Sequence, residues 1–144
     1  MPKSTSASNS ILALIFNATT WNLIAENDST SPATDLYLSL HTADPGVGGA
    51  QTTNETAYTN YARIAVARTT GGWDAPASGA TANAALAQFA QCGVTGATLT
   101  HVAIGTDAAG AGLVLYAGAL TSSLAVANGI QPQFAAGALD ISEA

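Results

Sequence analysis

Residues 36–41, Leu-Tyr-Leu-Ser-Leu-His, alternate between two faces in the pattern of a β-strand. The three leucines fall on one face, and the tyrosine, serine and histidine fall on the other. Turn signals follow at residues 44–46, Asp-Pro-Gly, and at residues 48–49, Gly-Gly. Residues 98–106 alternate in the same way. These stretches predict a chain built mainly from short strands.

Further short runs lie between Gly-rich turns along the rest of the chain. Candidate strands cover residues 60–68, 83–91, 113–120, 121–128, 130–135 and 138–141. The run 113–120 is apolar on both faces, so we expect it to be buried on both sides. Pro132 places its run at a sheet edge or a bulge. The Ala-rich run 83–91 is a weaker strand candidate, with a helix as the alternative.

The N-terminal region is the one part that favours a helix. Apolar residues between positions 11 and 16 recur at helical spacing, and Ser8 or Ser10 is placed to cap them. Residues 1–9 are expected to form a flexible arm, and residues 10–144 a single β domain. No alternation of strands with helices suggests a parallel sheet. We predict a mainly β fold, a jelly roll or β-sandwich of about seven to eight short antiparallel strands with one short N-terminal helix.

The composition excludes several classes of function. The 144 residues include 3 Lys or Arg and 9 Asp or Glu, so charged residues make up 8% of the chain, against about 25% in ordinary domains. A net charge of −6 argues against binding nucleic acid or an anionic membrane surface. The longest strongly apolar run, residues 11–16, is far too short to span a bilayer. We also expect no signal peptide, since the start of the chain lacks an apolar segment.

Residues able to carry chemistry are few and scattered. His41 and His101 lie at strand positions, and Asp44 follows the first of them in a turn. A metal site needs further converging ligands, and Cys92 has no nearby positive charge in sequence to activate its thiol. Lys3, the single lysine, has no phosphate-binding loop around it. We therefore predict no catalytic, cofactor-binding or metal site, and no enzymatic activity.

The remaining polar and aromatic residues are assigned ordinary roles. We expect the carboxylates to be solvated loop charges, with Asp44 and Asp107 bonding to their own turns. We expect the same of Glu26, Asp28, Asp140 and Glu143. The two arginines, Arg63 and Arg68, are expected to pair with carboxylates or carbonyls, within the fold or across an interface. Exposed aromatic side chains could stack on sugars, and the candidates are Tyr37, Tyr58, Tyr61 and Trp73.

Several segments resemble a known family when they are taken together and in order. These segments are Leu36–Pro45 (LYLSLHTADP), Tyr61-Ala62-Arg63, Thr100–Gly105 (THVAIG), Leu113–Gly118 (LVLYAG) and Phe134–Gly137 (FAAG). They are similar to small virion structural proteins of tailed bacteriophages, some identified as capsid decoration (cement) proteins and others as tail-fibre-like proteins. The resemblance runs from about residue 21 to residue 141. It implies a non-enzymatic structural part of a phage particle without a cofactor.

Within this resemblance we expect a decoration protein that binds the outside of the assembled head and stabilises contacts between major capsid protein subunits. It would be made in the host bacterial cytoplasm and act as a homodimer, or alternatively a homotrimer, with the N-terminal arm or residues 11–16 reaching a second subunit. The alternative is a tail-fibre-associated or receptor- or sugar-binding virion module. A small hydrolase using His41, His101 or Cys92 is a more distant alternative.

Overall fold

The computed structural model describes residues 4–21, 24–25, 33–46 and 48–143. The chain divides into two compact units, each assembled from separate stretches of sequence. Unit 1 takes residues 1–35, 66–87 and 134–144, and unit 2 takes residues 36–65 and 88–133. Each unit has its own set of buried apolar side chains.

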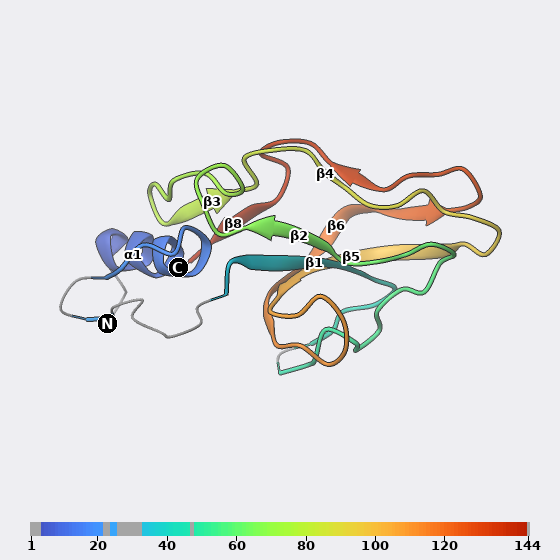
Figure 1. The fold of residues 1–144 in the computed structure, drawn as a ribbon, viewed down its shortest axis with the longest axis horizontal. Coiled ribbons are helices and arrows are strands. Elements are labelled where there is room, and N and C mark those ends of the chain that lie inside the picture. Colours follow the sequence, from blue (N-terminus) through green and yellow to red (C-terminus); the bar gives the residue numbers. More distant parts are fainter. Residues whose placement is uncertain (1–3, 22–23, 26–32, 47, 144) are drawn as a thin grey trace. The chain divides into compact units, whose positions relative to one another are not determined.

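Unit 1 combines a helix with a small sheet (Figure 1). Helix α1 (Thr5–Phe16) contacts β3 (Ala80–Ala82), which pairs antiparallel with β8 (Asp140–Ser142). Leu12 and Phe16 lie one helical turn apart on the buried face of α1. The ring of Phe16 meets the fully buried ring of Trp73 edge-on, with 4.7 Å between the ring centroids. These apolar contacts form the core of unit 1.

Helix α1 begins earlier than its apolar spacing predicts. Its N-cap is Ser4, whose side chain accepts a hydrogen bond from the backbone N–H of Ala7 at 3.2 Å, so Ser8 and Ser10 are not caps. Ser8 is buried, and the Asn9 side chain accepts a hydrogen bond from the backbone N–H of Gly79 at 2.5 Å. These contacts hold the first turns in place, so residues 5–9 are helical rather than part of a loose arm. Residues 1–3, the remainder of the expected arm, lie outside the described residues.

The main sheet has the strand order β2-β1-β5-β6. Strands β1 (Asp35–His41), β5 (Ala97–Gly105) and β6 (Val114–Val126) are antiparallel neighbours, while β2 (Ile64–Ala67) lies beyond β1 and crosses from unit 2 into unit 1. The predicted strands at 36–41 and 98–106 are confirmed. The three leucines of β1 are buried, as the alternation predicted. Figure 1 shows β5 and β6 running side by side.

The prediction for the late apolar run is wrong in two respects. Residues 113–120 and 121–128 form a single strand, β6, instead of two. Most of β6 is exposed rather than buried on both sides, because it stands last in the strand order, with no described strand beyond it. Two irregularities interrupt its pairing with β5, and the larger one leaves residues 120–123 opposite Thr100. The apolar residues of this run therefore belong to an exposed strand and not to the core.

A second two-stranded sheet pairs β4 (Ala87–Gln88) with β7 (Gln133–Phe134). The strand candidate at 83–91 is confirmed only for these two residues, and its helix alternative is wrong. Extended pairing continues past β4, since the N–H of Phe89 donates to the carbonyl of Pro132 at 2.9 Å. Strand β7 begins directly after Pro132, as expected for a proline at the margin of a sheet.

The structure confirms the predicted class. The chain is mainly β, with antiparallel sheets, eight strands in the described residues and one short N-terminal helix. The arrangement of these sheets as a jelly roll or sandwich, and the single domain over residues 10–144, stay predictions.

Candidate functional site

The main polar cluster of unit 2 is built around Arg63. Its guanidinium donates from Nε and Nη2 to the two carboxylate oxygens of Glu55, both at 2.7 Å. The Tyr61 hydroxyl donates to the same carboxylate at 2.8 Å and accepts from the backbone N–H of Leu40 at 3.1 Å. The Glu55 carboxylate raises the pKa of Arg63, and burial raises the pKa of Tyr61 above its ordinary range. The cluster therefore holds the arginine in its charged form and the tyrosine in its neutral form.

Arg63 also holds the loop of residues 107–110 against this cluster. Its Nη1 donates to the carbonyl of Asp107 at 2.8 Å, and its Nη2 donates to the carbonyl of Gly110 at 2.7 Å. Between the loop and the cluster lies an open hollow of about 460 Å³. The hollow is lined by residues 55–58, 60–63 and 108–110. Because the charged groups of the hollow already bind one another, this geometry serves to fix a loop rather than to bind a charged ligand.

The two histidines lie opposite each other on neighbouring strands, His41 on β1 and His101 on β5. His41 is fully buried, and its Nδ1 lies 2.9 Å from the carbonyl oxygen of Thr53. A carbonyl only accepts, so Nδ1 donates to Thr53 and Nε2 accepts from the Ser39 hydroxyl at 2.9 Å. Burial lowers the pKa of His41. The ring therefore fills the sheet as a neutral hydrogen-bonded group.

Asp44 does not join His41 in a site. Its carboxylate accepts from the backbone N–H of Gly46 at 2.8 Å, which confirms the predicted bond to its own turn. Asp107 uses its backbone in the loop contacts, with its N–H donating to the side chain of Gln51 at 2.9 Å. Asp140 is exposed on β8. The predicted loop charges Glu26 and Asp28 lie outside the described residues.

Cys92 is a buried free cysteine in unit 2. Its thiol lies 3.4 Å from the carbonyl oxygens of Gly93 and Thr95, and it donates weakly to both. Thr59 holds the turn that follows. Its backbone N–H donates to the carbonyl of Thr95 at 2.8 Å, and its hydroxyl accepts from the backbone N–H of Thr95 at 2.9 Å. The cysteine therefore occupies a structural position inside a turn. Across the described ranges, no three His, Cys, Asp or Glu side chains gather as metal ligands would.

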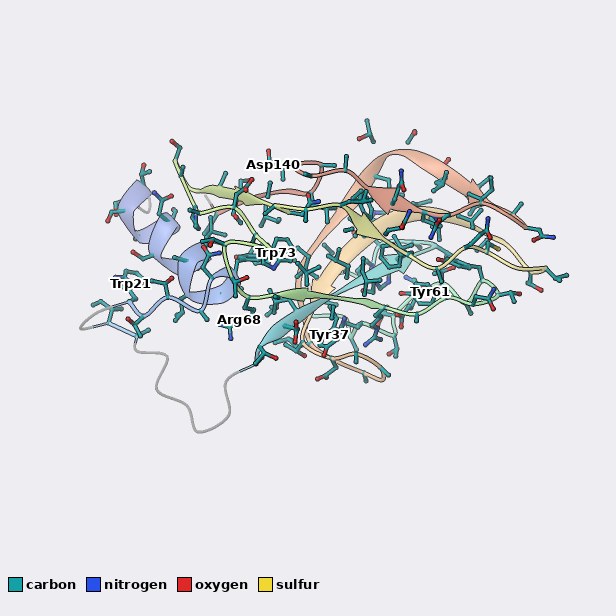
Figure 2. All side chains as sticks on the ribbon, turned by 45° about the horizontal axis from the view of Figure 1, so that its top comes forward. Trp21, Tyr37, Tyr61, Arg68, Trp73 and Asp140 are labelled. Carbon is teal, nitrogen blue, oxygen red and sulfur yellow. The ribbon has the colours of Figure 1, made fainter. Side chains whose placement is uncertain are left out.

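Arg68 closes the C-terminal end of α1 within unit 1 (Figure 2). Its guanidinium donates to the carbonyls of Leu14 and Ile15, at 2.7 and 2.6 Å, and to the carbonyl of Ala33 at 2.6 Å. The last carbonyls of a helix have no partner within the helix, and a cation there also offsets the helix dipole. The prediction that both arginines pair with carboxylates or carbonyls is confirmed within the fold.

The aromatic side chains are mostly not available for stacking. Trp73 and Tyr58 are buried, so the expectation that they are exposed is wrong; Figure 2 shows Trp73 inside unit 1. Tyr61 and Tyr37 are half-buried, and the Tyr61 hydroxyl belongs to the Arg63 cluster. Aromatic residues are few in this chain, and each unit uses one or more of them to fill its core beside leucine and isoleucine side chains.

Gln51 is a central residue that the sequence analysis missed. It is fully buried, its backbone N–H donates to the carbonyl of Gly112 at 2.8 Å, and its side chain binds the Asp107 loop. A Cβ atom added at Gly105 or Gly112 would collide with the Gln51 side chain. The two glycines could have indicated from the sequence that another group packs close to the backbone there, although they do not identify that group.

Comparison with known proteins gives the family. Residues 2–142 match the family described as Gp80: Podophage GP4 fiber I protein gp80. No curated protein matches the chain. None of the described helical segments has the length and apolarity that a membrane-spanning helix requires. Since the match covers nearly the entire sequence, the chain belongs to the podophage GP4 fiber I protein gp80 family and is a structural protein of a phage virion.

Proposed function

We propose that this chain is a non-enzymatic module of the fibre apparatus, through which a fibre is attached to the phage particle. The observation that carries the proposal is the match to a family described as a fiber protein over residues 2–142. The internal chemistry agrees with it, because Arg63, Arg68, His41 and Cys92 are all engaged in hydrogen bonds that hold the fold together. Burial of Trp73 and Tyr58 favours attachment over sugar binding as the role of the module.

Capsid decoration is the second candidate function. In that role the chain would bind the outer surface of the head and stabilise contacts between major capsid protein subunits. The absence of any internal repeat from the sequence favours it, because a fibre shaft is commonly built from repeated units. Binding only to the assembled shell would stabilise the shell by mass action. The partner would be the major capsid protein, together with a second or third copy of this chain.

The number of copies per particle separates the two functions. Purified particles are digested, and this chain is quantified by mass spectrometry against the major capsid protein; cryo-electron microscopy of the same particles then locates the density. A copy number that is a small fraction of that of the capsid protein, with density at the tail, supports the fibre role. A copy number comparable with that of the capsid protein, with density on the head, supports decoration and overturns the fibre role. Absence of the chain from purified particles overturns both.

A further inference from the structure

Strand β6 presents an unusual surface for an isolated acidic protein. From residue 117 to residue 125 every side chain is exposed except the half-buried Leu120. No charged residue occurs between Asp107 and Asp140, so the strand and both of its flanks are uncharged. Exposed strands of single chains usually carry lysine, proline or other charged residues that prevent pairing with another chain. Here the exposed part of β6 has none of them.

The part of β6 best suited to pairing is residues 116–119, which we name the open edge. These residues pair regularly with residues 101–104 of β5, between the two irregularities of the strand. No described strand pairs with the other side of β6. Gly118 lies in the middle, with no positive φ, and a Cβ atom added there would meet nothing within 4 Å. None of the described residues requires glycine at this position, whereas glycine in a strand often marks the close approach of another backbone.

We infer that the open edge pairs antiparallel with the open edge of a second copy of this chain, about a two-fold axis near Ala117 and Gly118. Charge favours a second copy as the occupant. Two chains of net charge −6 repel each other, so a surface without charged residues is where they meet with little local repulsion. A two-fold contact also lets one surface serve both partners. The four-stranded sheet of one copy would then continue into that of the other.

The size of the contact sets its strength. A two-fold axis near Ala117 and Gly118 lets at most eight residues of β6, 114–121, face the second copy. At roughly 3.4 Å each, over a sheet edge about 10 Å thick, they cover about 270 Å² on each copy. Stable dimers use about 800 Å² on each partner, so a contact of about a third of that area is weak or transient. The dimer is therefore expected to dissociate at micromolar concentration and to be populated at the high local concentration of a particle. This inference deepens the proposed structural role and rests on that role only for its place in the virion.

The test measures self-association of the full chain by sedimentation equilibrium, from micromolar concentration up to the solubility limit. Ala117→Glu places two carboxylates near each other across the two-fold axis, and we expect it to weaken dimerisation by at least about tenfold. The matched control is Ala65→Glu, which changes an exposed alanine on β2, the strand at the opposite end of the sheet. The control should dimerise like the wild type. An equimolar mixture of Ala117→Glu with Ala117→Lys should recover dimers that neither variant forms alone.

Circular dichroism establishes that each variant is folded. If Ala117→Glu is unfolded, Gly118→Glu takes its place, since the space in front of that position is open. A wild type that stays monomeric at every concentration overturns the inference, as does a trimer, or a folded charge variant that dimerises like the wild type. Because these measurements use the isolated chain, their failure leaves the location in the particle untouched. Conversely, a particle location other than the fibre leaves the dimer result standing.

Discussion

Removal of the Arg63 guanidinium is expected to destabilise unit 2 strongly. The side chain of Arg63 is 3% exposed, and that of Glu55 is 14% exposed, so this ion pair belongs to the buried class. In Arg63→Ala the Glu55 carboxylate keeps the Tyr61 hydroxyl but loses both of its charged hydrogen bonds, and the carbonyls of Asp107 and Gly110 lose their donor. Breaking a buried pair from one side costs about 3–5 kcal/mol, whereas an exposed pair contributes about 0.2–1 kcal/mol.

The assay is urea unfolding followed by circular dichroism, on Arg63→Ala, Glu55→Ala and the double variant. The double variant removes the unpaired charge along with its partner, so it should cost less than the sum of the two single losses, by about 0.5–3 kcal/mol. Arg63→Lys should recover only part of the stability, because an ammonium group does not reproduce the two parallel bonds to Glu55. A loss below about 1 kcal/mol in Arg63→Ala, with additive single effects, would refute the view that this pair organises the unit.

Three further outcomes are expected. Burial lowers the pKa of His41, so the unfolded chain binds the proton more tightly and the stability should fall as the pH drops below about 6.5. Urea midpoints measured at about pH 7.5 and about pH 5.5 should show this fall, and His41→Gln should reduce it. A stability that rises on acidification contradicts the assignment. Arg68→Met leaves the carbonyls of Leu14 and Ile15 without their charged donor, so unfolding should become easier by about 1.5–3 kcal/mol and amide exchange in α1 should accelerate, with unchanged exchange as the opposing result. Cys92 is buried and should react with a thiol reagent only as the chain unfolds; rapid labelling of the native protein would show that the turn around it is open.

Alternation was the reliable signal in this sequence. Strands β1 and β5 were predicted because their apolar residues alternate with polar ones. The alternation located both strands, but not which faces are buried: Ser39 and His41 of β1 are buried along with the three leucines, and the adjacent Ala103 and Ile104 of β5 are both buried. Short polar segments were less informative. The start of α1 depends on Ser8 and Asn9 packing against Gly79, 70 positions from Asn9 in the sequence. No local pattern reports a contact of that kind.

Burial of a strand on both faces could not be predicted from composition alone. Residues 113–120 are apolar enough for a central strand, but the position of β6 at the end of the sheet is decided by which strands pair, and that is a property of the whole chain. The arginines illustrate the same limit. Their need for acceptors was predictable from chemistry, whereas the choice of Glu55 for Arg63 and of the α1 carbonyls for Arg68 required the fold.

The interleaving of the two units has a consequence for how the protein is made. All residues of unit 2 have left the ribosome once Gln133 has been released, and its sheet is then free to form. Unit 1 has its helix and Trp73 early, but β3 has no partner until β8 is synthesised. Between the synthesis of β3 and that of β8 the nascent chain therefore carries an incomplete apolar core, the kind of intermediate that chaperones bind. Expression yield should accordingly depend on residues 140–142 far more than their small share of the buried surface suggests.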